Sequence, residues 1–437
     1  MTIDATAATD VDRIWSKYLL YPNGDEGTLF DPVSLESASL SADEVSRLRS
    51  EEPGIVAELA QFGFTSEPRA ASQRDSVLRH VQDLGLGGRP GRISGYRIVI
   101  TDRCNMKCSY CFVDTNTGSD DMTLPDLRAG LEYLFEQNAG REEVTIQWFG
   151  GEPTVRFDLM KQGDEYCREL AVKHDVGRVQ FTVVTNGVLL KDEMIEHFKE
   201  YKYGVGVSFD GTPEDNKVER FLLSGKPADE RIHRNIQRLI KAGVHVGCNL
   251  TPTPINVTKL PDTVDYVLSL GIKFIYVNTP IPISGRWHVD GEALCRAVFR
   301  SRLLALSHGA MLFSSMDRIY QSLDMRIPRV YEHIQKDGGL NAALLPNGRI
   351  SVLDLNWREQ QFVFPISQLR EHPELLEKAA KNLLPSSRCD ECPAAAVCGG
   401  PSRNDVSLRH NPEPDPQMCD FFQVGLRLAL TDHTGLQ

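Results

Sequence analysis

Short runs of β-branched and aromatic residues recur between residues 96 and 280, and segments with apolar positions at helical spacing separate them. Runs of this length and composition are typical of buried β-strands. Their alternation with helices predicts a parallel sheet built from βα units. We expect six strands, at residues 97–101, 144–149, 179–185, 204–209, 244–250 and 273–278. Six such units fit an α/β fold, a partial (β/α)6 barrel of the TIM type.

The first 82 residues have a different pattern. The stretch KYLLYPNGDEGTLFD places two aromatic and aliphatic runs on either side of Asn23-Gly24, which is typical of a β-hairpin. Apolar positions then follow at near-helical spacing, at Val45, Leu48, Ile55, Val56 and Leu59. We predict a small α+β domain over residues 1–90, and the Gly-rich stretch at residues 84–95 is the best candidate for a linker.

After about residue 310 the regular alternation fades. A chain of 437 residues is longer than one hydrophobic core usually supports. We therefore predict a barrel domain over residues 91–310 and a third domain over residues 311–437, which contains a second group of cysteines.

The composition, 41% hydrophobic and 25% charged, is that of an ordinary globular protein. A formal net charge of -12 argues against a nucleic-acid partner, because phosphate binding requires a basic surface. The N-terminal residues contain neither a basic segment nor an apolar run, and no stretch approaches the roughly 18 apolar residues of a membrane span. We expect a cytoplasmic protein with no membrane partner.

Ten cysteines in such a protein suggest metal or catalytic thiols before disulfides. Cys104, Cys108 and Cys111 follow the first predicted strand in the sequence CNMKCSYC. A disulfide would leave one thiol over, and structural zinc normally takes four ligands, whereas no fourth Cys or His lies nearby. Three thiolates on one loop suit a 4Fe-4S cluster with one iron open to a ligand.

Three further motifs lie where predicted strands end, which is where barrel enzymes place their sites. Gly150-Gly151-Glu152-Pro153 follows the second strand, Thr185-Asn186-Gly187 ends the third, and SFDGTPEDNKVER, residues 208–220, ends the fourth. Each motif alone is compatible with a turn or a solvated charge. Because they follow successive predicted strands, we interpret the three motifs together as parts of one site.

In that order the motifs resemble the radical SAM (S-adenosylmethionine) superfamily, over about residues 96–280. The family's loop has the form C-x3-C-x-aromatic-C, with Tyr110 as the aromatic residue here. The resemblance implies a 4Fe-4S cluster on Cys104, Cys108 and Cys111, and reductive cleavage of SAM to a 5'-deoxyadenosyl radical. It also implies contacts to SAM from Tyr110, Gly150, Gly151, Glu152, Pro153, Thr185, Asn186, Ser208, Asp210 and Arg220.

A second group of thiols consists of Cys389, Cys392, Cys398 and Cys419. Four thiolates suit structural zinc or a 4Fe-4S cluster. Their spacing resembles the SPASM domain of peptide-modifying enzymes, which implies an auxiliary 4Fe-4S cluster. The family's seven cysteines are incomplete here, since Ser402 and Leu353 stand where it has Cys. The resemblance therefore implies one outer auxiliary cluster without the inner one.

Three cysteines remain. Cys167 and Cys295 lie in predicted helices and are expected in the core. Cys248 lies near the end of the fifth predicted strand. It is a candidate hydrogen donor to a substrate radical, and packing with its apolar neighbours is the alternative.

The resemblance favours an enzyme that modifies a ribosomally made (RiPP) precursor peptide at a C–H bond by crosslinking, oxidation or epimerisation. It implies two partners, a precursor peptide whose leader binds the N-terminal domain and an electron donor such as a flavodoxin or ferredoxin. The alternatives are a radical SAM dehydrogenase or epimerase of a small molecule, and a sulfatase-type protein maturase. A metal-binding scaffold without catalysis has no need of an open iron.

Overall fold

The computed structural model describes residues 11–85, 91–113, 116, 121–279, 285–329, 339–355, 357, 359–379, 386–401, 406, 409 and 411–431. No helix among these residues has the length and apolar character needed to cross a membrane.

The N-terminal part is a four-stranded antiparallel sheet with three helices. Its strands, in spatial order, are β1 (Asp12–Ile14), β2 (Tyr18–Asn23), β3 (Glu26–Phe30) and β4 (Ser37–Leu40). β2 and β3 form the predicted hairpin, with Gly24 at a φ of 65° in the turn. The near-helical spacing that follows belongs to two helices, α1 (Ala42–Arg49) and α2 (Pro53–Ala60), because Pro53 begins a new helix. A third helix, α3 (Gln73–Asp83), follows.

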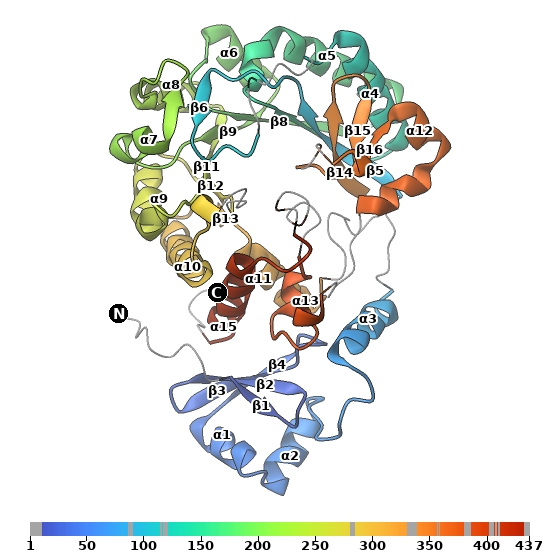
Figure 1. Ribbon diagram of the computed structural model, residues 1–437, viewed down its shortest axis with the longest axis vertical. Helices are drawn as coiled ribbons and strands as arrows, with labels where there is room; N and C mark the ends of the chain where they lie inside the picture. The colour runs from blue at the N-terminus through green and yellow to red at the C-terminus, as the bar shows by residue number, and fades with distance from the viewer. Residues whose placement is uncertain are drawn as a thin grey trace.

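The central part is a parallel sheet that curves into a partial barrel, with helices on its outer face (Figure 1). All six predicted strands are present, and β13 adds a seventh parallel strand. They are β5 (Arg92–Val99), β7 (Glu143–Phe149), β8 (Arg178–Thr185), β9 (Gly204–Ser208), β11 (His245–Leu250), β12 (Phe274–Val277) and β13 (Met311–Phe313).

The helices of the barrel are amphipathic, and their buried sides pack on the outward-facing strand residues. They are α4 (Leu124–Gln137), α5 (Phe157–Lys173), α6 (Asp192–Glu200), α7 (Pro213–Glu219), α8 (Asp229–Lys241), α9 (Leu260–Ser269) and α10 (Gly291–Ser307). Thr123 caps α4, and its side chain accepts from the backbone N–H of Asp126.

The sheet continues beyond β5 on its other side. β14 (Gly339–Leu345) runs parallel to β5, and β15 (Arg349–Ser351) and β16 (Val363–Pro365) complete the sheet. The register of β14 begins opposite Arg92, so residues 92–95 belong to a strand and not to the linker that we predicted. The chain therefore crosses residue 310 within one sheet, and the three domain limits remain a prediction.

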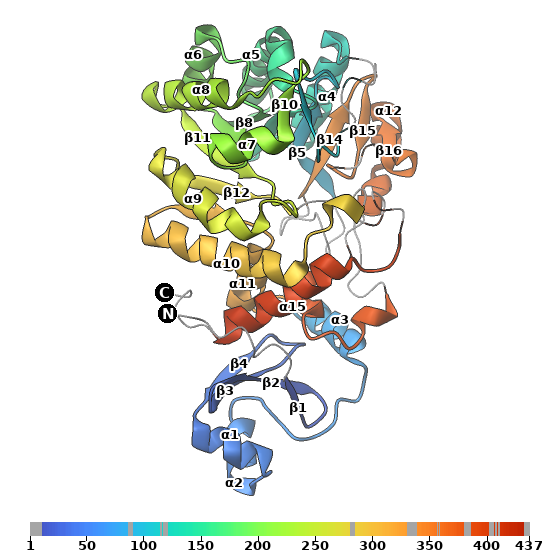
Figure 2. The ribbon, with the colours of Figure 1, turned by 60° about the vertical axis from the view of Figure 1, so that its left-hand side comes forward.

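The C-terminal part lies between the open side of the barrel and the N-terminal sheet (Figures 1 and 2). It includes α11 (Met316–Met325), α13 (Ala395–Cys398) and α15 (Pro416–Thr431), whereas α12 (Ile366–Glu371) lies beside β16 and α4 at the edge of the barrel. The end of α15 is tied to the N-terminal sheet, because Thr28 Oγ1 donates to the carbonyl of Leu430 at 2.9 Å and Asn23 Nδ2 to that of Thr431 at 3.1 Å.

Candidate active site

A cavity of about 970 Å³ occupies the inside of the barrel and the space beyond the carboxyl ends of its strands. Cysteines of both groups border it, although they are separated by almost 300 residues of sequence. The cavity thus joins the two predicted cluster sites in one chamber.

The loop that carries the first three cysteines is held by strand pairing. Within it, β6 (Met106–Cys108) pairs antiparallel with β10 (Arg220–Leu222), so that Cys108 lies opposite Arg220. Asn116 also binds Cys104 at both backbone groups, accepting from its N–H at 3.1 Å and donating to its carbonyl at 3.2 Å. These contacts fix the thiols on a defined loop above the barrel.

The three thiols lie close to one another and to a carboxylate. Burial, together with the negative charges of Glu152, Cys108 and Cys111, raises the pKa of Cys104 to about 12. Thiolates at this place require nearby cations, which the irons of a cluster supply. Within the described ranges no three Cys, His, Asp or Glu side chains converge tightly enough to hold a single metal ion. Three thiols on one loop suit a 4Fe-4S cluster that keeps one iron open to a ligand.

Gly150 and Gly151 allow the end of β7 to lie against the backbone of the cysteine loop. A Cβ on Gly150 would lie 2.3 Å from the carbonyl oxygen of Thr101, and Gly150 has a φ of 138°. A Cβ on Gly151 would lie 2.4 Å from the carbonyl oxygen of Asp102. The backbone N–H of Gly151 donates to the Thr101 carbonyl at 2.8 Å. The glycines are therefore explained by their contact with the cysteine loop, whereas the sequence suggested only close approach to a cofactor.

Replacing Gly151 with alanine is expected to displace the cysteine loop without removing a thiol. After anaerobic reconstitution the variant should bind about four irons fewer than the wild type, one cluster's worth. Gly91→Ala is the control, because no atom lies within 4 Å of a Cβ built at Gly91. Iron content equal to that of the Gly91 variant would contradict this role of Gly151.

Glu152 is the centre of a buried hydrogen-bond network. One carboxylate oxygen accepts from the hydroxyls of Thr154 at 2.6 Å and Thr185 at 2.7 Å, and the other accepts from the backbone N–H of Asn186 at 2.7 Å. Burial raises the pKa of Glu152, and these donors act against that rise. Asn186 Nδ2 in turn donates to Asn105 Oδ1 in the cysteine loop at 2.7 Å. The structure thus joins the GGEP motif, the TNG motif and the cysteine loop in one network, with Pro153 buried beside it.

Arg220, Asp210 and Tyr110 form a second buried group. Arg220 NH1 donates to the Tyr110 hydroxyl at 2.6 Å and lies 3.6 Å from the Asp210 carboxylate, which also accepts from Tyr110. Arg220 is 4% exposed, and its Nε–H is buried without a hydrogen-bond partner among the described residues. It borders the cavity, as does Ser208 at the end of β9. An incompletely paired buried cation fits a ligand carboxylate.

The second group of thiols also gathers in space. Cys389 ends a short 3-10 helix (Ser387–Cys389), Cys398 ends α13, and Cys419 lies in α15. Burial and the neighbouring cysteines raise the pKa of Cys392 to about 11 and that of Cys419 to about 12. Leu353 is fully buried in the core, and Ser402 lies outside the described residues.

The N-terminal part packs directly on this second group. Gln73 Nε2 at the start of α3 donates to the carbonyl of Cys392 at 3.2 Å. Val77 and Val81 on the same helix share a buried cluster with Cys389. The N-terminal helix α3 therefore covers Cys389 and Cys392.

The structure does not bring Cys248 into the chamber. Its thiol is fully buried and approaches the carbonyl oxygen of Phe209 at 3.6 Å, whereas Gly247 and Asn249 on either side border the cavity. Successive strand residues face opposite sides, so Cys248 faces the helices. This placement supports the packing interpretation and not the role of hydrogen donor. Cys167 and Cys295 are buried in α5 and α10, as predicted.

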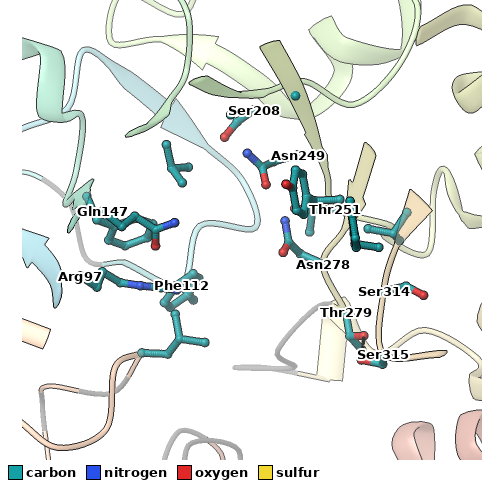
Figure 3. Close-up of a pocket in the computed structure, with 18 of the residues that line it drawn as sticks. Arg97, Phe112, Gln147, Ser208, Asn249, Thr251, Asn278, Thr279, Ser314 and Ser315 are labelled. Atoms are coloured by element: carbon teal, nitrogen blue, oxygen red, sulfur yellow. Dashed lines mark hydrogen bonds between the residues drawn. The ribbon is translucent and has the colours of Figure 1, made fainter. Parts of the chain in front are cut away.

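Several polar residues of the chamber were not identified from the sequence. Asn249, Thr251 and Asn278 project into the cavity from the ends of β11 and β12, and Gln147 projects from β7 on the opposite wall (Figure 3). The available signal was their alternation with apolar residues along each strand. That pattern indicates which residues share one face of a sheet, but it does not indicate whether that face encloses a cavity.

Comparison with known protein families decides the nature of the barrel. The model of the Radical SAM superfamily matches residues 98–267. The chain carries a radical SAM domain. Enzymes of this family bind a 4Fe-4S cluster and SAM, and the match spans the cysteine loop and both buried groups around it.

Two relatives extend the comparison. An uncharacterised protein of Methanocaldococcus jannaschii is 28% identical over 176 residues, which are 40% of this chain and 59% of that protein. The radical SAM cyclopropyl synthase TigE of Paramaledivibacter caminithermalis is 21% identical over 401 residues, 86% of this chain and 82% of TigE. The second match reaches far beyond the radical SAM domain.

Solved structures show the same fold. The structure of anSMEcpe with bound AdoMet and Kp18Cys peptide has a TM-score of 0.66 at 16% identity, and it covers 77% of this chain and 96% of that chain. Streptococcus suis SuiB bound to the precursor peptide SuiA has a TM-score of 0.56 at 15% identity, with 90% and 96% covered. At these identities the likeness shows the fold alone.

Proposed function

We propose that the protein is a radical SAM enzyme that modifies a precursor peptide. The observation that carries the proposal is the single chamber bordered by Cys104, Cys108 and Cys111 on one side and by the C-terminal cysteines on the other. In this family the bound cluster and SAM supply a 5'-deoxyadenosyl radical, which activates a C–H bond. The residues of this chain bind and orient those groups and the substrate.

Two groups of this chain would hold the cofactors. Cys104, Cys108 and Cys111 would bind the barrel cluster, with their loop fixed by the β6–β10 pairing and by Asn116. The buried Arg220 would pair with the carboxylate of SAM through its unpartnered Nε–H. The second oxygen of Glu152, which accepts one hydrogen bond from Asn186, would accept another from the amino group of SAM.

The C-terminal cysteines would hold one auxiliary 4Fe-4S cluster. All four border the same cavity, and the other three raise the pKa of Cys419, which supports this assignment. The fully buried Leu353 supports the absence of the inner cluster. A one-electron oxidation of substrate in the chamber would then have an acceptor at the cavity wall, and an external flavodoxin or ferredoxin would supply electrons to the barrel cluster.

The peptide substrate is supported by the relatives and by the N-terminal sheet. TigE matches across 86% of this chain, and the fold is that of SuiB, whose structure contains a precursor peptide. The N-terminal sheet ends in edge strands β1 and β4, and an extended leader could add a strand at such an edge. A small-molecule dehydrogenase or epimerase is the second candidate, favoured by the incomplete cysteine set, which also disfavours a sulfatase-type maturase.

The experiment that tests the peptide substrate begins with a search of the neighbouring reading frames for a short precursor-like peptide. Such a peptide, incubated with the reconstituted enzyme, SAM and a reductant, is expected to stimulate formation of 5'-deoxyadenosine. Mass spectrometry should show loss of two hydrogen atoms for a crosslink or oxidation, or an unchanged mass with an inverted residue for epimerisation. A scrambled peptide of the same composition is the control. Equal turnover with both peptides would contradict the peptide assignment.

A further inference from the structure

Four large apolar side chains on the last two barrel strands are exposed on one face. Phe274 is 37% exposed, Tyr276 39%, Met311 47% and Phe313 36%. The parallel register places Phe274 beside Met311 and Tyr276 beside Phe313, so that all four share one side of the sheet. Single exposed apolar residues are ordinary, but a contiguous patch marks a binding surface. We call these four residues the ring platform.

The rings of the platform are ordered relative to each other and to the cavity. Tyr276 and Phe313 stack with centroids 5.0 Å apart and planes 18° apart. Phe274, Tyr276 and Phe313 border the cavity. The intervening Ile275 and Leu312 are buried on the other face, against the helices. The three rings of the platform therefore form part of an inner wall of the chamber.

Glycines on the neighbouring strands keep the space beside the platform open. A Cβ on Gly247 of β11 would lie 3.1 Å from Cε2 of Tyr276. A Cβ on Gly206 of β9 would lie 2.4 Å from Nδ2 of Asn249. A side chain at Gly247 would occupy the space of the Tyr276 ring, and one at Gly206 would occupy the space of the Asn249 carboxamide. The hollow next to the platform thus follows from the sequence of β9 and β11.

Uncharged polar groups flank the platform. Asn249 and Asn278 point into the cavity from the strand ends (Figure 3), and neither side chain makes a hydrogen bond to another described residue. A carboxamide both donates and accepts, as a peptide unit does. Arg97, a cation that also borders the cavity, is already paired with Asp354 at 3.4 Å and lies over the ring of Phe149. Arg318, Lys202 and His245 also border the cavity. The two carboxamides suit the N–H and C=O groups of a peptide segment.

We infer that the ring platform binds a large apolar side chain of the substrate, preferably an aromatic one, while Asn249 and Asn278 bind the adjoining peptide units. The inference rests on the proposed peptide substrate and narrows it. The platform lies inside the barrel on β12 and β13, whereas the groups assigned to SAM lie at the ends of β7, β8 and β9 and on the cysteine loop.

The test measures fragment binding to the full-length, anaerobically reconstituted protein by NMR saturation transfer. The probes are N-acetyltyrosinamide, N-acetyltryptophanamide and N-acetylalaninamide. The aromatic amides are expected to bind about fivefold more tightly than the alanine amide, because a stacked aromatic pair contributes about that much to affinity. Tyr276→Ser and Phe313→Ser should each weaken binding of the aromatic amides by about fivefold. Tyr276→Phe keeps the ring and should bind the aromatic amides as the wild type does. Phe62→Ser is the control, since Phe62 is 69% exposed in the N-terminal part and away from the chamber.

Equal binding of the three probes, or unchanged aromatic binding in Tyr276→Ser, would overturn the inference. S-adenosylhomocysteine is the competing ligand, because its adenine could also stack on the rings. If Tyr276→Ser weakened S-adenosylhomocysteine and left the aromatic amides unaffected, the platform would belong to the cofactor and the inference would be wrong. None of these binding measurements requires turnover. Failure of the proposed function can therefore be told apart, because 5'-deoxyadenosine would be absent while fragment binding stayed intact.

Discussion

Replacing Cys104, Cys108 and Cys111 together with alanine is expected to abolish the formation of 5'-deoxyadenosine from SAM. The reason is that no other described thiol borders the cavity beside the Glu152 and Arg220 groups. A cluster without its three ligands would not form, and SAM would have neither an iron to bind nor an electron to accept. The assay is anaerobic incubation with SAM and dithionite, followed by chromatography.

The control for this variant is Cys248→Ala. Cys248 is a thiol of the same barrel, but it is buried on the outer face of β11 and does not border the chamber. It should therefore keep both its iron content and its cleavage of SAM. Persistent cleavage in the triple variant would show that the assignment of the cluster is wrong. Loss of substrate inversion in the Cys248 variant, with cleavage intact, would restore Cys248 as a hydrogen donor.

Replacing Cys392 with alanine is expected to remove about four irons per chain and to leave cleavage of SAM intact. Cys392 contributes its thiol to the second group, while its contact with Gln73 uses the backbone carbonyl and survives the substitution. The loss should therefore be confined to the second cluster. Modification of substrate should fall with it if that cluster accepts an electron in the reaction.

Iron and zinc analysis of the Cys392 variant separates the two interpretations of the C-terminal cysteines. Loss of one zinc with unchanged iron would make the C-terminal site structural and would remove the basis for electron transfer. Asp390→Asn, two residues away in the same loop, is the control and should keep the metal content of the wild type.

The strands of the barrel could be predicted because each has a short apolar run bounded by turn residues. The end of β5 nearest the N-terminus could not be predicted in this way, because it is a strand only through pairing with β14, whose residues lie almost 250 positions later. The domain limit near residue 310 depends on the same pairing.

The cysteines and the GGEP motif could be predicted because their spacing is local. The surroundings of Arg220 could not, since its burial beside Tyr110 and Asp210 depends on the pairing of β10 with the cysteine loop. The position of Cys248 near the end of a strand could be predicted, but its absence from the cavity wall depends on the side of β11 on which its thiol lies. The ring platform joins β12 and β13, which are separated by α10, so no local pattern marks it.

The most direct test of the central claim is the iron, sulfide and zinc content of the anaerobically reconstituted wild-type protein, measured together with reductant-dependent formation of 5'-deoxyadenosine. We predict about eight irons and eight sulfides per chain, no zinc, and cleavage of SAM. Zinc in place of iron, with no cleavage of SAM, would contradict the assignment of this chain as a radical SAM enzyme with two clusters.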